Sequence, residues 1–141
     1  METLKEIIDQ KEIEILSTKY LNDQQLIELV GFMIQKQSII NSLSLKEGSL
    51  TKTGISYLSK NYNRLFSLDL SENNLLDDEI EDIPYLTNLK QLCIRNNGLT
   101  QKGVELLQKM NLEYLNVEGN DTIGEKPIRK TSIGEKPIAK Q

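Results

Sequence analysis

The chain has 141 residues, of which 38% are hydrophobic and 27% are charged, and its formal net charge is −4 at pH 7. This length suits one modest domain, and the acidic balance gives no global positive field for nucleic acid or an anionic membrane. The sequence has no histidine and a single cysteine, Cys93. That composition excludes Ser/His/Asp and Cys/His nucleophilic sites, zinc sites built on cysteine and histidine, and an intrachain disulfide.

Targeting and cofactor signals are also missing from the sequence. No run of about 18 apolar residues occurs, so we expect no membrane span. The N-terminal residues do not join a basic region to an apolar stretch, so we expect no Sec-type signal. The single cysteine fits a reducing compartment, and we expect a cytoplasmic protein. Because no P-loop or Gly-rich dinucleotide fingerprint is present, we expect no cofactor.

The N-terminal segment predicts a short helix followed by a strand. The helix would carry the apolar residues Leu4, Ile7 and Ile8. Residues 12–15 alternate charged and apolar side chains, as a strand with one buried face does. We therefore expect Ile13 and Ile15 to face inward.

A second helix is predicted after Asn22. Asparagine is a favoured N-cap, and Gln25, three residues later, completes the pattern of a capping box. The apolar residues that follow have helical spacing and predict one buried stripe. They are Leu26, Leu29, Val30, Met33 and Ile34.

From residue 40 onward the chain repeats one pattern. Leu-x-x-Leu-x-Leu-x-x-Asn-x-Leu at residues 65–75 recurs from Leu89 and from Leu112, with starts 24 and 23 residues apart. A degenerate copy starts at Ile40, where Gly48 replaces the asparagine. A fixed period of this length predicts a stacked solenoid in which each repeat contributes one coil.

Each repeat should form a short strand and then turn sharply at its asparagine. In the segment 68–70 the two leucines would point inward and Asp69 outward. An asparagine side chain can donate and accept, so Asn73, Asn97 and Asn120 should bridge backbone groups inside the turn. Gly48 can adopt the backbone angles of a turn but cannot bridge it. We therefore expect a looser corner there.

The segments that follow each turn are predicted to be helical. Residues 50–58 and 99–107 share the pattern Leu-Thr-x-x-Gly-x-x-x-Leu, whereas residues 75–83 carry Glu79 in place of the glycine. Pro84 should end or tighten the middle segment.

The C-terminal segment 123–141 is different, because residues 123–130 are nearly repeated as residues 133–140. The ten-residue period is too short for a coil, and each copy contains a proline that interrupts helix and ladder alike. Three interpretations are open. The segment is a weakly ordered basic tail, it caps the open end of the last coil, or it is a peptide motif for a partner.

The repeat at residues 65–75 resembles the leucine-rich repeat family. The continuation at residues 99–107 looks most like the ribonuclease-inhibitor-type subclass. The resemblance implies an α/β solenoid, a short horseshoe arc with parallel strands on the concave face and helices on the convex face. Residues 1–38 would be a helical cap and an irregular first coil, in which Ile13 and Ile15 correspond to Leu43 and Leu45. Residues 39–122 would form the repeats.

The resemblance also implies a protein-binding concave face made by outward side chains of the strands. Matching positions select as candidates Ser44, Lys46, Asp69, Ser71, Gln91, Cys93, Arg95, Tyr114, Asn116 and Glu118. Flanking members of the same rows are Ser42, Glu47, Ser67, Glu72 and Asn96. Arg95 and Tyr114 are the best anchors, because arginine and tyrosine are enriched in binding hot spots.

The expected function is a non-catalytic protein-interaction module with a protein partner, existing as a monomer or weakly self-associating. Short repeats of this kind occur in bacterial proteins and in effectors of intracellular bacteria. One reading is therefore a bacterial effector or adaptor, which would act inside a host cell. The alternatives are a self-assembling structural solenoid and a metal-dependent enzyme that uses the acidic cluster at residues 77–79. Five strands about 4.8 Å apart and five residues long give a patch on the order of 350 Å², below the roughly 800 Å² per partner of a standard interface.

Overall fold

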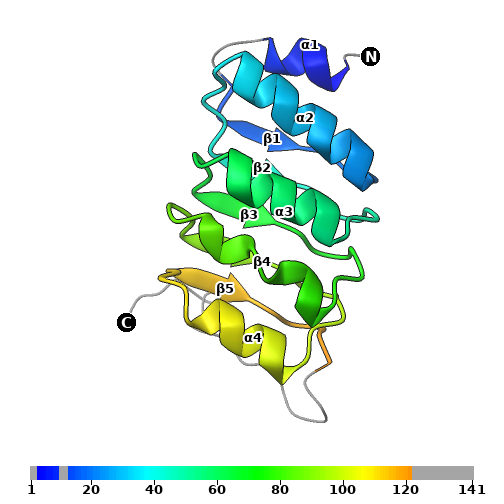
Figure 1. Ribbon diagram of the computed structural model, residues 1–141, viewed down its shortest axis with the longest axis vertical. Coiled ribbons are helices and arrows are strands. Elements are labelled where there is room, and N and C mark those ends of the chain that lie inside the picture. The colour runs from blue at the N-terminus through cyan, green and yellow to red at the C-terminus, as the bar shows by residue number, and fades with distance from the viewer. Residues whose placement is uncertain (1–2, 10–12, 122–141) are drawn as a thin grey trace.

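The computed structural model describes residues 3–9 and 13–121, in which strands and return segments alternate along a stack (Figure 1). The strands are β1 (Ile15–Ser17), β2 (Ser42–Ser44), β3 (Ser67–Asp69), β4 (Gln91–Cys93) and β5 (Tyr114–Asn116). The α-helices are α1 (Leu4–Ile8), α2 (Asp23–Gln35), α3 (Lys52–Asn61) and α4 (Gln101–Gln108). Two 3₁₀ segments, η1 (Asp77–Ile80) and η2 (Ile83–Tyr85), lie between α3 and α4.

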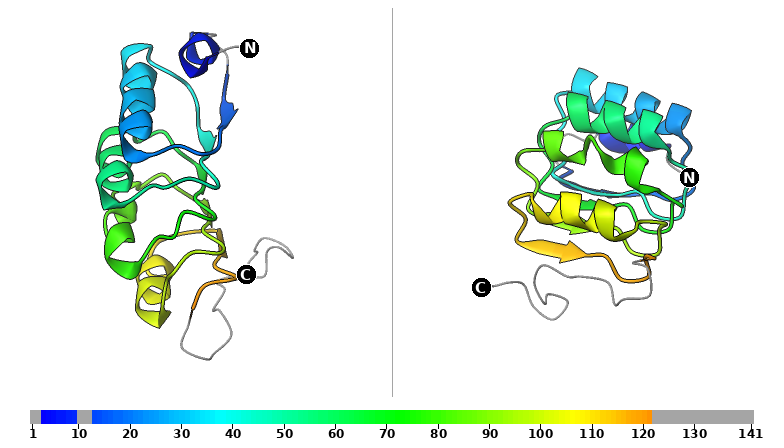
Figure 2. Two further views of the ribbon diagram at one scale, coloured as in Figure 1. Left: turned by 90° about the vertical axis from the view of Figure 1, so that its right-hand side faces the viewer. Right: turned by 60° about the horizontal axis from the view of Figure 1, so that its bottom comes forward.

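The strands form one parallel sheet in the order β1-β2-β3-β4-β5. The side view shows this sheet on one side of the stack and helices α2, α3 and α4 on the other, with α1 at the N-terminal end (Figure 2). The predicted α/β solenoid is confirmed. We number the coils by their residues: coil 1 is 13–39, coil 2 is 40–64, coil 3 is 65–88, coil 4 is 89–111 and coil 5 is 112–121.

The core runs between the sheet and the helices along the whole stack. The middle residue of each strand points into it, and the register aligns these five residues: Leu16, Leu43, Leu68, Leu92 and Leu115. The helices contribute buried residues such as Leu26, Ile55 and Val104. Burying a leucine or isoleucine side chain contributes about 1.5–3 kcal/mol, so contacts between coils dominate the stability of this thin core.

The three repeat asparagines bridge backbone groups of their turns, as predicted, and they also join neighbouring coils in a ladder. The Asn97 side-chain nitrogen donates to three carbonyl oxygens, those of Leu70, Ile94 and Arg95, at 3.1–3.2 Å. Its oxygen accepts the backbone N–H groups of Asn73 and Leu75 at 3.0 and 2.8 Å. In the same way Asn73 joins coil 3 to coil 2, and Asn120 joins coil 5 to coil 4. Each asparagine therefore satisfies backbone groups of its own coil and of the preceding one.

Gly48 has a different role from the one predicted. The left-handed backbone angle of this turn belongs to Glu47, with φ 55°, and not to the glycine. The equivalent position in all five turns has a positive φ, at Tyr20, Glu47, Glu72, Asn96 and Gly119. A Cβ on Gly48 would lie 2.6 Å from the Leu21 carbonyl oxygen. Gly48 is thus needed for the close approach of coils 1 and 2.

The glycines of α3 and α4 are explained by an aspartate in the preceding coil. The Asp23 carboxylate accepts the N–H groups of Thr51 at 2.8 Å and Gly54 at 3.1 Å, and also the Thr51 hydroxyl. The Asp77 carboxylate accepts the N–H and hydroxyl of Thr100 in the same way. We call this arrangement the aspartate clasp. A Cβ on Gly54 or Gly103 would overlap the clasp carboxylate.

The middle return segment is not the predicted helix but the two 3₁₀ turns η1 and η2. Pro84 has no N–H to continue an α-helix and disfavours helical angles at the preceding residue. The tightening expected from Pro84 is therefore confirmed. Lys52 stands where coils 1 and 3 have the clasp aspartates Asp23 and Asp77, and it pairs instead with Glu81 at 3.1 Å. Glu79 can replace the glycine because no carboxylate occupies that space.

The inward position predicted for Ile15 is wrong, whereas Ile13 is half-buried and packs against the core as expected. Ile15 pairs with Ser42 and is 70% exposed, while Leu16 is the buried residue that pairs with Leu43. Coil 1 is longer than the later coils, so a fixed 30-residue offset selected the wrong face. The capping box at Asn22 and Gln25 is confirmed. The apolar stripe of α2 is buried except for Ile34, which is 45% exposed.

The predictions for the segment 123–141, including its capping role, lie outside the described residues. Residues 1–2, 10–12 and 122 are also outside them.

Candidate protein-binding face

The strand face is the solvent side of the sheet, made by the outward residues of each strand and of the turn that follows it. Its first row is Ile15, Ser42, Ser67, Gln91 and Tyr114, and its second row is Ser17, Ser44, Asp69, Cys93 and Asn116. Beyond the strand ends lie Lys19, Lys46, Ser71, Arg95 and Glu118. Since these positions repeat in register, the candidates chosen from the sequence do lie on one sheet surface.

Several of these candidates use their polar side-chain atoms in hydrogen bonds within the protein. An Asp69 carboxylate oxygen accepts the N–H of Ser71 at 2.9 Å, and the Asn116 side-chain oxygen accepts that of Glu118 at 3.0 Å. The Ser44 hydroxyl oxygen is buried and makes no hydrogen bond within residues 3–9 and 13–121. Asp69 and Asn116 therefore stabilise the turn after their own strand as well as lining the face.

The prediction that Ser71 is an outward, partner-binding residue is wrong, because only 5% of it is exposed. Its hydroxyl accepts the N–H of Arg95 at 3.2 Å and lies 3.3 Å from the Cys93 sulfur. Its hydroxyl caps the Arg95 N–H of coil 4, which is equivalent to the N–H groups that Asp69 and Asn116 cap in their own coils. In coil 4 the position of these two residues is taken by Cys93. Ser71 offers almost no surface to a partner.

Cys93 is half-buried on β4, the strand next to Asp69. Burial raises the pKa of its thiol, and the nearby Asp69 carboxylate raises it further, while the hydrogen bond with Ser71 acts in the opposite direction. A raised pKa keeps the sulfur protonated at neutral pH, which disfavours nucleophilic chemistry.

Tyr114 is the first residue of β5, whereas Arg95 lies just beyond the end of the adjacent strand β4. Arg95 is exposed, with its Nε 3.8 Å from a Glu118 carboxylate oxygen, and the Tyr114 hydroxyl accepts the Asn116 amide at 3.2 Å. Because Tyr114 pairs with Gln91, Arg95 lies four residues further along, or roughly 13 Å at strand spacing. A partner that contacts both must span most of the strand length.

Two apolar residues at the N-terminal end of this face were missed in the sequence. Ile15 is 70% exposed in the first row, and Tyr20 is 73% exposed just after β1. The frame Ile13-x-x-Leu16, which matches Ile40-x-x-Leu43, was the signal that would have placed Ile15 outward. The strand face therefore has an exposed hydrophobic pair at one end and the Arg95–Tyr114 pair at the other.

Charges along the rim of the face are paired across coils. Lys19 Nζ lies 2.9 Å from a Glu47 carboxylate oxygen, and this contact lowers the pKa of Glu47 and raises that of Lys19. The Asn96 side-chain amide reaches Glu72 at 3.4 Å. Lys46 is half-buried beside Glu47. The rim therefore presents both signs of charge and favours no partner of a single sign.

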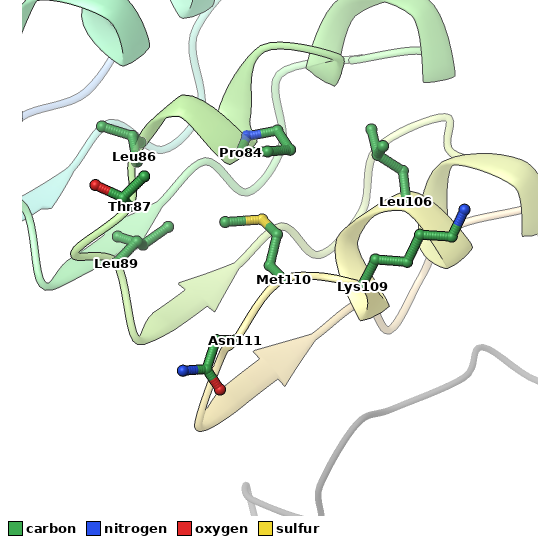
Figure 3. Close-up of a pocket in the computed structure, with 8 residues that line it drawn as sticks. All are labelled: Pro84, Leu86, Thr87, Leu89, Leu106, Lys109, Met110 and Asn111. Carbon is green, nitrogen blue, oxygen red and sulfur yellow. The ribbon is translucent and has the colours of Figure 1, made fainter.

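The opposite side of the stack carries an apolar hollow of about 390 Å³ below η2 (Figure 3). Its walls come from the η2 loop and from the end of α4, and Met110 reaches toward the loop side chains. The lining residues are Pro84, Leu86, Thr87, Leu89, Leu106, Lys109, Met110 and Asn111. The hollow lies where the middle return segment is 3₁₀ instead of α-helical. Its shape depends on Pro84 and was not predicted.

The acidic cluster at residues 77–79 is engaged in the fold. Asp77 forms the clasp with Thr100, and a Glu79 carboxylate oxygen accepts the N–H of Leu76 at 2.9 Å. Within residues 3–9 and 13–121, no group of three or more His, Cys, Asp or Glu side chains could hold a metal ion. The helices in the same ranges are too short or too polar to cross a bilayer.

No protein-family model matches the chain, and no curated protein matches it. Among solved structures it is similar to an internalin, inlF of Listeria monocytogenes, with a TM-score of 0.49 and 18% identity. The similarity covers 93% of this chain and 49% of that one, so the chain spans about half the length of the internalin. The parallel strands, the asparagine ladder and the repeated buried leucines decide the architecture. The fold is a leucine-rich repeat solenoid.

Proposed function

We propose that this chain is a non-catalytic protein-binding module that holds a protein partner on its strand face. The supporting observation is that Ile15 and Tyr114 lie on one continuous sheet, with Tyr20 and Arg95 in the turns that follow its strands. Binding energy in protein interfaces concentrates in a few aromatic and arginine anchors that are surrounded by weaker contacts. The small and half-buried residues between the two pairs, mainly serines, leave room for side chains of a partner.

The size of the face sets the kind of interaction. The five strands give a flat patch on the order of 350 Å², and a standard interface needs roughly 800 Å² on each partner. We therefore propose that binding to the face alone is weak and transient, and that tight binding uses additional surface. The Leu-Thr-x-x-Gly return segments, which form the clasped helices α3 and α4, support assignment to the ribonuclease-inhibitor-type subclass.

We further propose a reducing, cytoplasmic setting, because the only cysteine is a half-buried thiol with a raised pKa. An effector of a bacterium would meet the same conditions inside a host cell. Fractionation of cells expressing the tagged chain tests this setting, and recovery only from a secreted, oxidising compartment would contradict it.

A capture experiment tests the strand face. The immobilised full chain is compared with Arg95→Glu/Tyr114→Ala for retention of proteins from cell extract, and retained proteins are quantified by mass spectrometry. The matched control is Lys60→Glu/Tyr85→Ala, a cation and tyrosine on the helix side whose ammonium lies 5.4 Å from the ring centroid. We expect the strand-face variant to lose a partner by more than about tenfold while the control retains it.

Equal retention by the wild type and the strand-face variant would refute the proposal. Light scattering over a concentration series accompanies the capture. If the particle size grows with protein concentration, and this growth is lost in Ile15→Ser, the self-assembling alternative is favoured instead.

A further inference from the structure

A second surface lies outside the strand face, where the chain enters strands β2, β3 and β4. A shallow hollow of about 590 Å³ is lined there by side chains from coils 2, 3 and 4 and from the end of coil 1. We call it the edge hollow. Its lining combines two large apolar residues, Ile39 and Phe66, two cations, Arg64 and Lys90, and three asparagines.

The apolar residues of the edge hollow are held outward by the backbone. Ile39 is 40% exposed although Ser38 and Ile40 on either side are buried. The Tyr62 hydroxyl, which is itself buried, lies 2.7 Å from the Ile40 carbonyl oxygen and 3.2 Å from that of Ser38. Ile39 therefore cannot turn into the core without breaking these contacts.

Phe66 is fixed in the same way and is 43% exposed. Its N–H donates to the Asn41 carbonyl oxygen at 2.8 Å, and its own carbonyl accepts the N–H of Lys90 at 2.8 Å. The core position beside it is already filled by Leu65. Two large hydrophobic side chains are thus held outward by the hydrogen-bonded backbone beside them, where a partner can contact both.

The charge of the edge hollow is opposite to that of the chain. Arg64 and Lys90 line it, and among residues 3–9 and 13–121 no carboxylate does, although the chain as a whole carries a net charge of −4. Lys90 Nζ also reaches the Asn111 carbonyl oxygen at 3.4 Å, which holds its ammonium in place. An arginine that is exposed here can take a carboxylate with two parallel hydrogen bonds.

Acidic residues mark both limits of the site. Equivalent backbone hydrogen bonds place Glu14, Asn41, Phe66, Lys90 and Glu113 in one row across the five coils. The cationic and apolar stretch is three coils wide, or roughly 10 Å at strand spacing. That width suits about three extended residues, and Glu14 and Glu113 would repel additional acidic residues at either end.

The asparagines supply polar groups for a peptide backbone. Asn41, Asn63 and Asn88 are exposed, and the Asn88 amide donates to the Asn63 carbonyl oxygen at 2.9 Å. Amide side chains both donate and accept, which matches the alternating groups of an extended chain.

We propose that the edge hollow binds an extended peptide segment in which a large apolar side chain is flanked by acidic residues. The apolar side chain rests on Ile39 and Phe66, and the carboxylates pair with Arg64 and Lys90. This site is additional to the strand face, because none of its four anchoring side chains is in the strand-face rows.

The test is an NMR titration of the full ¹⁵N-labelled chain with a blocked peptide, Gly-Glu-Leu-Glu-Gly. The charge-reversed peptide Gly-Lys-Leu-Lys-Gly and a short oligothymidylate are the comparison ligands. We expect saturable shifts of the Phe66 and Lys90 amides with the glutamate peptide alone. Arg64→Glu and Phe66→Ser should each weaken this binding by about tenfold or more, with the spectrum reporting that each variant is folded. Lys60→Glu and Tyr85→Ser, on the helix side, should leave it unchanged.

Absence of shifts up to about 5 mM peptide, a range that would still reveal very weak binding, would overturn the proposal. Equal shifts with the lysine peptide would also overturn it, as would shifts confined to the strand face. Shifts of the same amides with oligothymidylate but not with the glutamate peptide would replace the peptide by a nucleic-acid phosphate. The strand-face capture uses different residues, so failure of one experiment leaves the other result standing.

Discussion

The junction between coils 1 and 2 and the junction between coils 2 and 3 are held by opposite devices. At the first, Asp23 clasps the start of α3, and Gly48 replaces the ladder asparagine. At the second, Asn73 supplies the ladder, but no clasp forms because Lys52 stands at the aspartate position. The junction between coils 3 and 4 has both devices, through Asn97 and Asp77.

This difference shows that contacts between coils, and not only the residues of the repeat itself, maintain the conformation of each repeat. A glycine at the start of a return helix is needed only where the preceding coil carries the clasp aspartate. Where the aspartate is absent, a glutamate is accommodated and the segment is free to become 3₁₀. The ladder and the clasp hold neighbouring residues of the same turn, such as Leu50 and Thr51 in coil 2, so one can be missing while the other still aligns the coils.

The largest expected effect is the loss of a ladder residue. Asn97→Ala removes hydrogen bonds to three carbonyl oxygens and two N–H groups, and it should lower the free energy of unfolding by about 1–3 kcal/mol. Urea denaturation measures the change. The matched control is Asn111→Ala, an exposed asparagine that should cost little. An unchanged melting temperature for Asn97→Ala would contradict the structural role of the ladder.

The clasp predicts that substitutions of Asp77 and Gly103 have non-additive effects on the free energy of unfolding. Gly103→Ala places a Cβ against the Asp77 carboxylate and should cost about 1–3 kcal/mol. Asp77→Ala alone should cost about 1–2 kcal/mol through lost hydrogen bonds to Thr100. In the Asp77→Ala background the glycine substitution should be nearly neutral, because alanine is the better helix former. A double-mutant cycle with strictly additive costs would contradict the clasp as the reason for the glycine.

A glycine that faces no clasp should respond in the opposite direction. Gly31 lies within α2, and a Cβ added to it meets no atom within 4 Å. Gly31→Ala should therefore raise the free energy of unfolding by about 0.4–1 kcal/mol, through helix propensity and reduced freedom of the unfolded chain. Thermal and urea unfolding would both detect it, and destabilisation would mean that α2 tolerates no side chain at this position.

The smallest effect is expected where Lys52 replaces the clasp aspartate. The Lys52–Glu81 pair is about half exposed on both sides. Exposed pairs of this kind contribute little because water and salt screen them. Lys52→Ala should leave the unfolding midpoint unchanged within error at both low and high salt. A clear loss of stability would show that this ion pair substitutes for the clasp.

The sequence predicted the repeated parts of the molecule well. The inward leucines, the bridging asparagines and the capping box at Asn22 each depend on contacts that a local pattern encodes. The failures are specific. Ile15 was assigned to the core because coil 1 differs in length from the others, and Ser71 was assigned to the surface because its hydrogen bond to Arg95 comes from another coil. The middle return segment was expected to be a helix, although Pro84 was recognised as a breaker.

The repeat register predicted which positions form the candidate binding face, but it did not identify all of the exposed side chains there. Arg95 and Tyr114 were selected from the repeat register, and the structure places both on the sheet surface. Ile15 and Tyr20 were missed, since the first coil has only a weak repeat signal. The edge hollow could not be foreseen, because its residues are about 25 residues apart in sequence, one coil period, and meet only when the coils stack.

The sequence by itself determined the period, the parallel strands, the buried leucines and the bridging role of the asparagines, because each is a local pattern repeated at a fixed spacing. Only the tertiary structure decided what lies between coils. It placed Asp23 and Asp77 against the helices that follow, gave Gly48 its role in close approach, and turned Ile39 and Phe66 outward beside Arg64. The physical reason is that in a solenoid the side chains of one coil find their partners in the next, and the repeat pattern does not specify those pairs.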